Sequence, residues 1–426
     1  MKICFFTKYP PIEGGVSAQT YWLSKALGEK GVEIHIVTNS LEVENEYKEN
    51  IDWENLDDLS KYQPQNVLVH NLSSNARAHN RFFHIPQSPA YLERLINKGL
   101  EVFINHRCDL IDSFYLLPYG LAGFFVKILT GKPQIFRHAG SDVSRLFLNP
   151  ELTKIFQVAL NNADRIVISQ GGANFFQQLG INASRLHFQK LWMPYPAAFN
   201  PDVSSADLNE LGINISEEIP VITYIGKYNK QFKGLYELTE ILKIIRQKFF
   251  LMLVTSGGSV TEFESHLKKF KNLEGKYKIL GFVPPWRIPA IIKRSSCVIQ
   301  LEKDFPIAAH HPIQLQETMA VGKTCLISDE LYEKFREKFK LEDGKNVLVA
   351  NPKDQNQLKE KLKLILSKPE LLEKIGREAH NTIDWQKEFD EYLRNNIDLY
   401  EEMADAKHSS IEKALKLYDR IFQKTS

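Results

Sequence analysis

The first forty residues alternate between apolar strand patterns and an amphipathic helix pattern. Ile3–Thr7 and Glu33–Thr38 predict two buried strands, and Ala18–Lys30, which Gly31 follows, predicts the helix between them. A strand–helix–strand unit of this kind implies two parallel strands joined by a right-handed crossover. The sequence therefore predicts an α/β fold built on a parallel sheet.

The same alternation continues along the chain and begins a second time after the polar run Asn200–Ala206. The other elements predicted before that run are strands at Asn66–His70, Val102–Asn105, Leu110–Ser113, Gln134–His138 and Arg165–Ser169 and a helix at Leu152–Asn161. The elements predicted after it are strands at Pro220–Ile225, Phe250–Thr255, Lys278–Gly281, Cys297–Leu301 and Thr324–Ser328 and helices near Leu235–Lys248 and Ile288–Arg294. We therefore expect two α/β sheets in series, with ligands at the carboxyl ends of the strands and in a cleft between the two domains.

Composition restricts the class of protein further. A chain of 426 residues is too long for one ordinary domain, and 43% hydrophobic with 25% charged residues is typical of a soluble globular protein. The net charge of +2 gives no electrostatic signature of nucleic-acid binding, so we expect no nucleic-acid partner. The scattered cysteines predict buried free thiols in a reducing compartment; they are Cys4, Cys108, Cys297 and Cys325.

The sequence shows no targeting segment and no membrane span. The most apolar window, Phe114–Thr130, is interrupted by Pro118 and Gly120 and predicts a buried helix instead. We expect a cytoplasmic protein, and peripheral contact with the inner face of a membrane stays open. Asp390–Met403 predicts a helix that packs back on the first domain. Ser409–Gln423 is also amphipathic and is expected to pack within the chain, with another subunit or a membrane surface as alternatives.

The residues after position 310 predict a helix that Gly322 ends. Pro312 suits the first turn of a helix, where its missing N–H group needs no partner. The backbone N–H groups of Ile313 and Gln314 would then face an anion, which the helix dipole also favours. Glu317 lies about one turn further along, within reach of the hydroxyls of a ribose. The pattern suits a nucleotide diphosphate, and an ordinary helix with a proline start is the alternative.

A second pattern, from Gly226 to Gly234, follows a predicted strand and precedes a predicted helix. Lysines in such a loop can neutralise a diphosphate, including the charge that grows on a leaving group. We assign that role to Lys227 and Lys233 and interpret Lys230 as a solvated loop residue.

Two further patterns follow strands of the first sheet. Gly14 and Gly15 come between the first strand and its helix, where a backbone without side chains can approach a ligand. His138 closes a later strand and can hydrogen-bond a sugar hydroxyl, and Asp142 can orient an acceptor or cap the next helix.

Four histidines show no spacing typical of metal ligands, so we expect no metal site from them. They are His79, His84, His310 and His311. The double glycine is also not the G-x-G-x-x-G fingerprint of nicotinamide dehydrogenases.

In this order, on two α/β domains, the motifs resemble the retaining GT-B glycosyltransferases of family four. The segments that carry the resemblance are Glu13-Gly14-Gly15, Asp109–Asp142, Ala163–Ser169, Gly226-Lys227 with Lys233-Gly234, Leu280–Pro284 and Pro312–Gly322. The resemblance implies two Rossmann-like domains that face a central cleft, with C-terminal helices crossing back to the first domain. It places an acceptor-side domain at residues 1–198, a nucleotide-sugar domain at 199–385 and the C-terminal helices at 386–426.

The resemblance also implies a role for each motif. The donor diphosphate is expected on Lys227, which stands where the family has arginine, on Lys233, and on the N–H groups of Ile313 and Gln314. The nucleotide base is expected beside Phe282 and Val283. Glu317 matches the second glutamate of the E-x7-E motif, which binds ribose, and the glycine pair of the first domain completes the donor side.

One position departs from the family pattern. Ala309 occupies the place of the first glutamate, which in the family contacts the donor sugar, and His311-Pro312 replaces a Phe-Gly pair. Either another group contacts the sugar, for which His310, His311 and Asp304 are the nearby candidates, or activity has been lost.

The resemblance therefore implies a hexosyltransferase of the EC 2.4 class that acts without a metal. It would move a sugar from a UDP-, GDP- or ADP-linked donor to a glycan or lipid-linked acceptor in glycan, glycolipid or polysaccharide biosynthesis. His138 and Asp142 would position sugar and acceptor. The alternatives are a non-catalytic relative that binds a nucleotide or a partner, and a nucleotide-sugar epimerase or hydrolase. The oligomeric state does not follow from the sequence.

Overall fold

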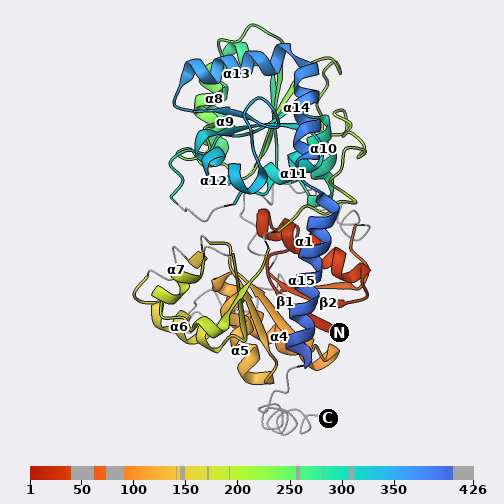
Figure 1. Cartoon of the computed structure of the whole chain (residues 1–426), viewed down its shortest axis with the longest axis vertical. Coiled ribbons are helices and arrows are strands. Elements are labelled where there is room, and N and C mark those ends of the chain that lie inside the picture. The colour runs from red at the N-terminus through yellow and green to blue at the C-terminus, as the bar shows by residue number, and fades with distance from the viewer. Residues whose placement is uncertain are drawn as a thin grey trace, which may run out of the picture. The chain divides into compact units, whose positions relative to one another are not determined.

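In the computed structural model, the chain divides into two compact units (Figure 1). The residues that the structure describes are 1–39, 62–72, 91–140, 142–143, 149–169, 172–190, 192–255, 260–281, 283–306 and 311–405. The first unit falls within Met1–Glu42, Tyr62–Trp192 and Asp390–Ser426, and the second includes Met193–Phe389. The segment Ser409–Gln423, for which a helix was predicted, lies outside the described residues.

The first unit contains a seven-stranded sheet in which every pairing is parallel. In sheet order its strands are β3 (Val67–Asn71), β2 (Glu33–Thr38), β1 (Lys2–Phe6), β4 (Leu110–Phe114), β5 (Gln134–Arg137), β6 (Arg165–Ile168) and β7 (Leu186–Phe188). Strand β1 lies inside the sheet between β2 and β4, with Ile3 paired to Ile34 on one side and to Leu110 on the other. Its apolar side chains are buried. The order reverses direction beside β1, as in a Rossmann-like domain.

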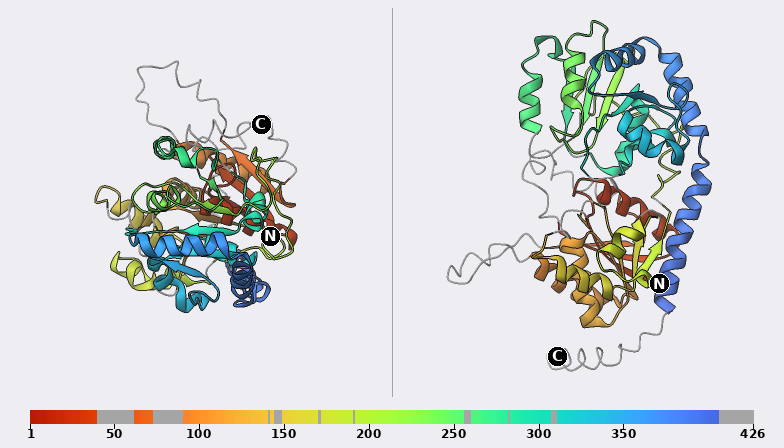
Figure 2. Two further views of the ribbon diagram at one scale, coloured as in Figure 1. Left: turned by 90° about the horizontal axis from the view of Figure 1, so that it is seen from above. Right: turned by 60° about the vertical axis from the view of Figure 1, so that its left-hand side comes forward.

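Helices connect these strands on both faces of the sheet (Figures 1 and 2). The helices of the first unit are α1 (Gly15–Glu29), α4 (Tyr91–His106), η4 (Leu116–Gly120), α5 (Leu121–Thr130), α6 (Thr153–Asn162), α7 (Ala173–Gln178) and η7 (Ala183–Arg185). The strand predicted at Val102–Asn105 is wrong, because these residues belong to α4. Leu95, Val102 and Phe103 are the buried side of that helix.

The apolar window Phe114–Thr130 is also more complex than the single buried helix predicted. Phe114 ends β4, and the next residues, Leu116–Gly120, form a kinked turn in which Leu117 has an extended backbone with φ −122° and ψ 138°. Only Leu121–Thr130 form α5. The last turn of α5 leaves Ile128 57% exposed. Each helix among the described residues is too short or too polar to span a lipid bilayer.

The second unit contains a six-stranded sheet, again parallel throughout. In sheet order its strands are β10 (Tyr277–Leu280), β9 (Phe250–Val254), β8 (Val221–Ile225), β11 (Cys297–Gln300), β12 (Thr324–Ser328) and β13 (Leu348–Ala350). Its helices are α8 (Leu235–Leu242), α9 (Val260–Leu267), η8 (Lys271–Leu273), η9 (Pro285–Arg287), α10 (Ile288–Arg294), α11 (Gln314–Ala320), α12 (Asp329–Phe339), α13 (Gln355–Ser367) and α14 (Pro369–Asn381). The predicted bounds of β12 and α10 are confirmed, whereas α8 ends at Leu242 and not near Lys248.

The predicted α/β fold with two Rossmann-like domains is confirmed by these two sheets. All four cysteines are buried and free, as their scattered positions predicted. The thiols are therefore held in the cores of the units, and burial raises the pKa of Cys297 to about 12.

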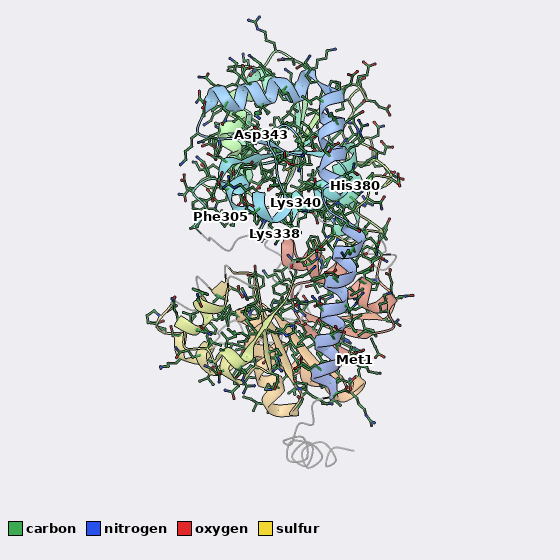
Figure 3. The ribbon with its side chains drawn as sticks, viewed as in Figure 1. Met1, Phe305, Lys338, Lys340, Asp343 and His380 are labelled. Carbon is green, nitrogen blue, oxygen red and sulfur yellow. The ribbon has the colours of Figure 1, made fainter. Side chains whose placement is uncertain are left out.

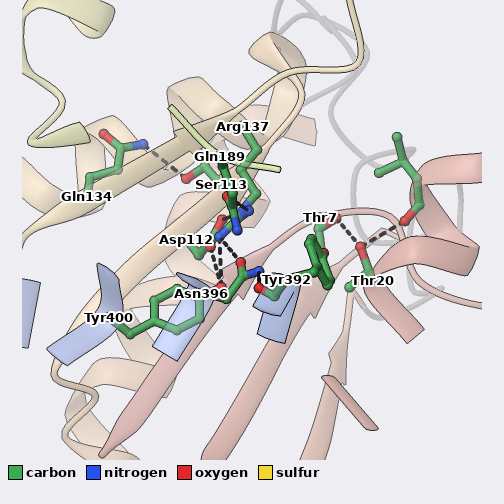
Figure 4. Close-up of polar contacts among 11 residues, drawn as sticks. Thr7, Thr20, Asp112, Ser113, Gln134, Arg137, Gln189, Tyr392, Asn396 and Tyr400 are labelled. Carbon is green, nitrogen blue, oxygen red and sulfur yellow. Dashed lines mark hydrogen bonds and ion pairs between the residues drawn. The ribbon is translucent and has the colours of Figure 1, made fainter. Parts of the chain in front are cut away.

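The last described helix, α15 (Trp385–Asp405), carries the chain from the second unit into the first. Inside the first unit it meets Arg137, the last residue of β5, in a buried polar network (Figure 4). The Arg137 guanidinium donates to Asp112 Oδ2 at 2.8 Å, to Asn396 Oδ1 at 2.8 Å and to the Tyr400 hydroxyl at 3.0 Å, and that hydroxyl donates to Asp112 at 2.7 Å. The prediction that Asp390–Met403 packs on the first domain is confirmed by these contacts.

Candidate functional site

The carboxyl ends of the parallel strands in the second unit bring most of the predicted donor residues to one edge of the sheet. Gly226 and Lys227 come directly after β8, and the Gly226 N–H donates to the Val254 carbonyl at the end of β9, at 3.0 Å. Lys227 is exposed, and its backbone carbonyl accepts a hydrogen bond from the Tyr224 hydroxyl at 3.0 Å. The edge therefore has an ordered backbone and a lysine side chain directed to its surface.

The loop that carries the lysines ends at Gly234, the N-cap residue of α8, and there it packs against Leu301, the residue after β11. Gly234 has φ +64°, and a Cβ there would lie 2.4 Å from the Leu301 carbonyl oxygen. Only glycine fits both the backbone angle and this close approach. The loop is therefore fixed next to the residues that follow β11.

Lys233 meets a carboxylate that the sequence analysis did not select. Its ammonium group forms an ion pair with Glu302, a buried residue just after β11, and lies 4.8 Å from the centre of the Phe305 ring. Phe305 and Lys338 are marked at this edge of the second unit in Figure 3. The signal in the sequence was an acidic residue at the end of a buried strand, a position where side chains reach a ligand edge.

Helix α11 starts at this same edge, because it follows β11 in a strand–helix–strand unit. It begins at Gln314 with Ile313 as its cap, so the prediction that Pro312 lies in the first turn is wrong: Pro312 precedes the cap. The first intrahelical bond runs from the Glu317 N–H to the Ile313 carbonyl at 3.0 Å. The N–H groups at the start of the helix are those that an α-helix cannot satisfy internally.

Glu317 lies in the first turn of α11 and is only 3% exposed. Burial raises the pKa of this carboxyl to about 8. The ionised form of this buried carboxyl is stabilised by a partner that donates hydrogen bonds to it, such as a pair of ribose hydroxyls.

The neighbours of α11 fix its start. His311 Nε2 and Gln316 Oε1 lie 2.6 Å apart, and Gln316 Nε2 donates to Met193 Sδ at 3.2 Å. The His311 ring also packs edge-on against Phe335, with 4.7 Å between ring centres. Within the second unit, His311 therefore orders the turn before the helix.

Five of the single residues named in the sequence analysis lie outside the described residues: His79, His84, Phe282, Ala309 and His310. Val283 is half-buried in the connection between β10 and η9. The Asp304 carboxylate, one of the groups considered for the sugar, accepts from Lys353 Nζ at 2.8 Å on the exposed surface.

The predicted residues of the first unit also gather at the carboxyl edge of their sheet. Gly14 caps α1 with φ +124°, and Gly15 is the first residue of that helix. At the end of β5, His138 Nδ1 accepts from the Gly140 N–H at 3.0 Å, and the ring packs edge-on against Phe176. Because Nδ1 is an acceptor, the hydrogen of the neutral ring is on Nε2, and burial lowers the pKa of His138.

Asp142 is buried beside His138 and binds backbone. Its two oxygens accept from the Ala139 N–H at 3.0 Å and from the Leu116 N–H at 2.9 Å. The carboxylate thus ties the loop after β5 to the residues after β4. This arrangement suits a positioning role for Asp142 more than direct contact with a reacting atom.

Two parallel Rossmann-like sheets with ligand-type residues at their carboxyl edges define a class of protein, and comparison with known families names it. Residues 13–188 match the family model described as Glycosyltransferase Family 4, and residues 209–382 match the one described as Glycosyl transferases group 1. These matches cover the core of both units. Together with the fold, they support a GT-B glycosyltransferase.

The relatives agree with this class. The chain is 23% identical to an uncharacterized glycosyltransferase of Methanocaldococcus jannaschii, over 95% of this chain and 99% of the relative. It is 22% identical to the N-acetyl-alpha-D-glucosaminyl L-malate synthase of Bacillus anthracis, over 75% of this chain and 77% of the relative. Among solved structures, the Anabaena protein HepE in complex with UDP-glucose matches with a TM-score of 0.65 and 16% identity, over 95% of this chain and 99% of HepE.

Proposed function

We propose that this protein transfers a hexosyl group from a nucleotide-diphosphate sugar to an acceptor hydroxyl, with retention of configuration and without a metal ion in the reaction. The observation that carries the proposal is the edge of the second sheet, where Lys227, Lys233 and the start of α11 with Glu317 gather within the family match at residues 209–382. Cations, unsatisfied N–H groups and a buried carboxyl suit the diphosphate and ribose of one ligand.

In this proposal the diphosphate binds Lys227, Lys233 and the N–H groups of Ile313 and Gln314. The ion pair with buried Glu302 fixes the position of the Lys233 ammonium before the donor arrives. Glu317 accepts hydrogen bonds from the ribose, and Phe282 and Val283 flank the base. Lysines and helix N–H groups then supply the charge neutralisation that a metal ion supplies in other transferases.

The chemical step breaks the bond between the anomeric carbon and the diphosphate oxygen. The acceptor oxygen forms its new bond on the same face of the sugar, and its proton passes to the departing diphosphate. His138, whose Nε2 carries the hydrogen in the neutral ring, donates to a hydroxyl of the sugar, and Asp142 holds the His138 loop in place. Retention and the role of His138 rest on the family resemblance together with these contacts.

The proposed acceptor is a glycan or lipid-linked saccharide, and the proposed setting is cytoplasmic glycan, glycolipid or polysaccharide biosynthesis. A UDP-sugar is the first donor to test, because HepE was solved with UDP-glucose and the Bacillus relative is named for an N-acetylglucosaminyl product. GDP-, ADP- and TDP-sugars are the alternatives in the same screen.

The test is a thermal-shift and sugar-release screen of the purified protein against these donors in the presence of EDTA. We expect one nucleotide class to raise the melting temperature and to release sugar slowly. Lys233→Ala and Glu317→Ala should lower kcat/KM for that donor by about 10²-fold, as expected for removal of one preorganised charge contact.

Lys230 supplies a matched control on the same loop. It is an exposed lysine paired with Glu262, so Lys230→Ala should keep the wild-type kcat/KM. Nucleotide binding without turnover in any acceptor mixture would support a non-catalytic relative. Release of sugar that no acceptor accelerates would support an epimerase or hydrolase.

A further inference from the structure

Three histidines from three elements of the first unit lie together on one face of its sheet. His35 is in β2, His70 is in the edge strand β3, and His106 is the last residue of α4. In the parallel register His35 pairs with Leu68 and His70 with Val37, so the first two side chains are two positions apart on the same face. One ring nitrogen from each histidine lies within 4.8 Å of the other two.

The nitrogens are close to the spacing that a metal ion requires. His35 Nδ1 and His70 Nε2 are 2.9 Å apart. Two nitrogens bound to one tetrahedral zinc ion at 2.0–2.1 Å lie about 3.3 Å from each other. The His35–His70 pair is therefore already near this geometry, and a ring nitrogen of His106, at the end of α4, lies within 4.8 Å of both.

A carboxylate stands behind the buried member of the cluster. Glu33 Oε1 lies 2.9 Å from His35 Nε2 and 3.0 Å from Lys2 Nζ. A carboxylate can only accept from a ring N–H here, so the hydrogen of His35 is on Nε2 and the lone pair of Nδ1 points to the cluster. This carboxylate–histidine arrangement is the usual outer sphere of a protein metal site.

The exposure of the rings also suits ion binding. His35 has no exposed side-chain surface, whereas His70 and His106 are half-buried and give an ion a path from solvent. An ordinary hydrogen bond would explain the pair His35–His70. It leaves unexplained why a third imidazole packs 4.2 Å from the centre of the His35 ring, where an apolar side chain would bury more favourably.

We propose that His35, His70 and His106 bind one zinc ion, or a divalent transition metal of similar preference for imidazole, with water in the remaining position. The ion would tie the edge strand β3 and the end of α4 to β2. It lies among residues that the sugar transfer does not use, so it is a structural site independent of the proposed donor site.

The test uses full-length protein without a polyhistidine tag, stripped with EDTA and titrated with Zn²⁺ by calorimetry and elemental analysis. We expect one zinc ion per chain. His106→Gln should weaken its affinity by more than about 10-fold, the smallest loss expected when even an outer-sphere partner is removed. Cobalt-loaded protein should show the strong visible absorption of a tetrahedral site, and His106→Gln should abolish it.

His187, a half-buried histidine of β7 in the same unit, supplies the control, and His187→Gln should bind zinc like the wild type. Circular dichroism verifies that each variant is folded, and His70→Gln replaces His106→Gln if the latter unfolds. Absence of zinc binding to the wild type would overturn the proposal. Zinc binding that neither His106→Gln nor His70→Gln weakens would also overturn it. Because these readouts need no sugar donor, they stand or fall separately from the glycosyltransferase assay.

Discussion

At the scale of single residues, Glu317 is the group whose chemistry the fold changes most clearly. It is a carboxylic acid that is 3% exposed, and burial raises its pKa to about 8 from an ordinary value near 4.5. Between these two pH values the folded protein holds a proton that the unfolded chain has released. The free energy of unfolding of the unliganded protein therefore decreases as the pH rises from about 4.5 to about 8.

This sign gives a prediction for Glu317→Gln, which removes the ionisation and keeps the shape. The variant should have the same free energy of unfolding as the wild type near pH 4.5. Its stability relative to the wild type should then increase progressively toward pH 8. The difference in unfolding free energy should grow by up to about 1.4 kcal/mol per pH unit. Denaturant unfolding at several pH values measures it.

An exposed glutamate of α15 provides the comparison, since Glu401→Gln should leave the pH dependence of stability as in the wild type. Parallel stability curves for the wild type and Glu317→Gln would show that Glu317 is ionised in the unliganded protein. The same variant should still bind the donor less tightly, because a neutral amide accepts weaker hydrogen bonds from ribose than a carboxylate does.

At the scale of elements, two arginines of neighbouring strands contact α15 in opposite environments. Arg137 is buried and contacts Asp112, Gln189, Asn396 and Tyr400. Arg165, on β6, pairs with Glu402 at the surface, where their side chains are 30% and 47% exposed. Both residues are cations paired with a carboxylate, so a comparison of their variants measures how burial changes the contribution of such a pair to stability.

We predict that Arg137→Met destabilises the protein by about 3–5 kcal/mol, because it leaves the Asp112 carboxylate buried without its cation. Arg165→Met should cost at most about 1 kcal/mol, because solvent screens the exposed pair. Chemical denaturation monitored by circular dichroism compares the two variants directly.

The double variant Arg137→Met with Asp112→Leu should recover part of the loss, since an apolar pair of similar volume no longer holds an uncompensated charge. Equal losses for the two single variants would show that the Arg137 network does not anchor α15 more strongly than the surface pair.

At the scale of the whole molecule, the two proposed sites belong to different units. The donor residues Lys227, Lys233 and Glu317 are in the second unit, and the histidine cluster is in the first. The two ligands should therefore protect different parts of the chain.

Hydrogen exchange should show this division. UDP should slow exchange in the connection from β8 to α8 and in α11, whereas zinc should slow it in β2, β3 and the end of α4, because a bound ligand suppresses local opening of what it contacts. Glu317→Ala should remove the UDP effect and leave the zinc effect. Protection of the same peptides by both ligands would contradict the assignment of separate sites.

Much of the fold could be predicted because hydrophobic periodicity is local. Buried parallel strands are continuous apolar runs, so Thr324–Ser328 was predicted with its correct ends. The error at Val102–Asn105 has the same origin, since a run of four residues cannot distinguish a strand from the buried side of a helix. Strands β7 and β13 have three residues each and give too short a pattern to detect.

The sequence by itself determined the alternation of strands and helices, and with it which residues follow a strand at the ligand edge, because parallel strands place all their carboxyl ends on one side. Only the tertiary structure decided which side chains meet there and what state they hold. Lys233 contacts Glu302, and three histidines from β2, β3 and α4 converge, although the spacing between them in the chain carries no ligand motif. The physical reason is that periodicity is set by neighbours along the chain, whereas ion pairs, burial and the pKa of Glu317 are set by neighbours in space.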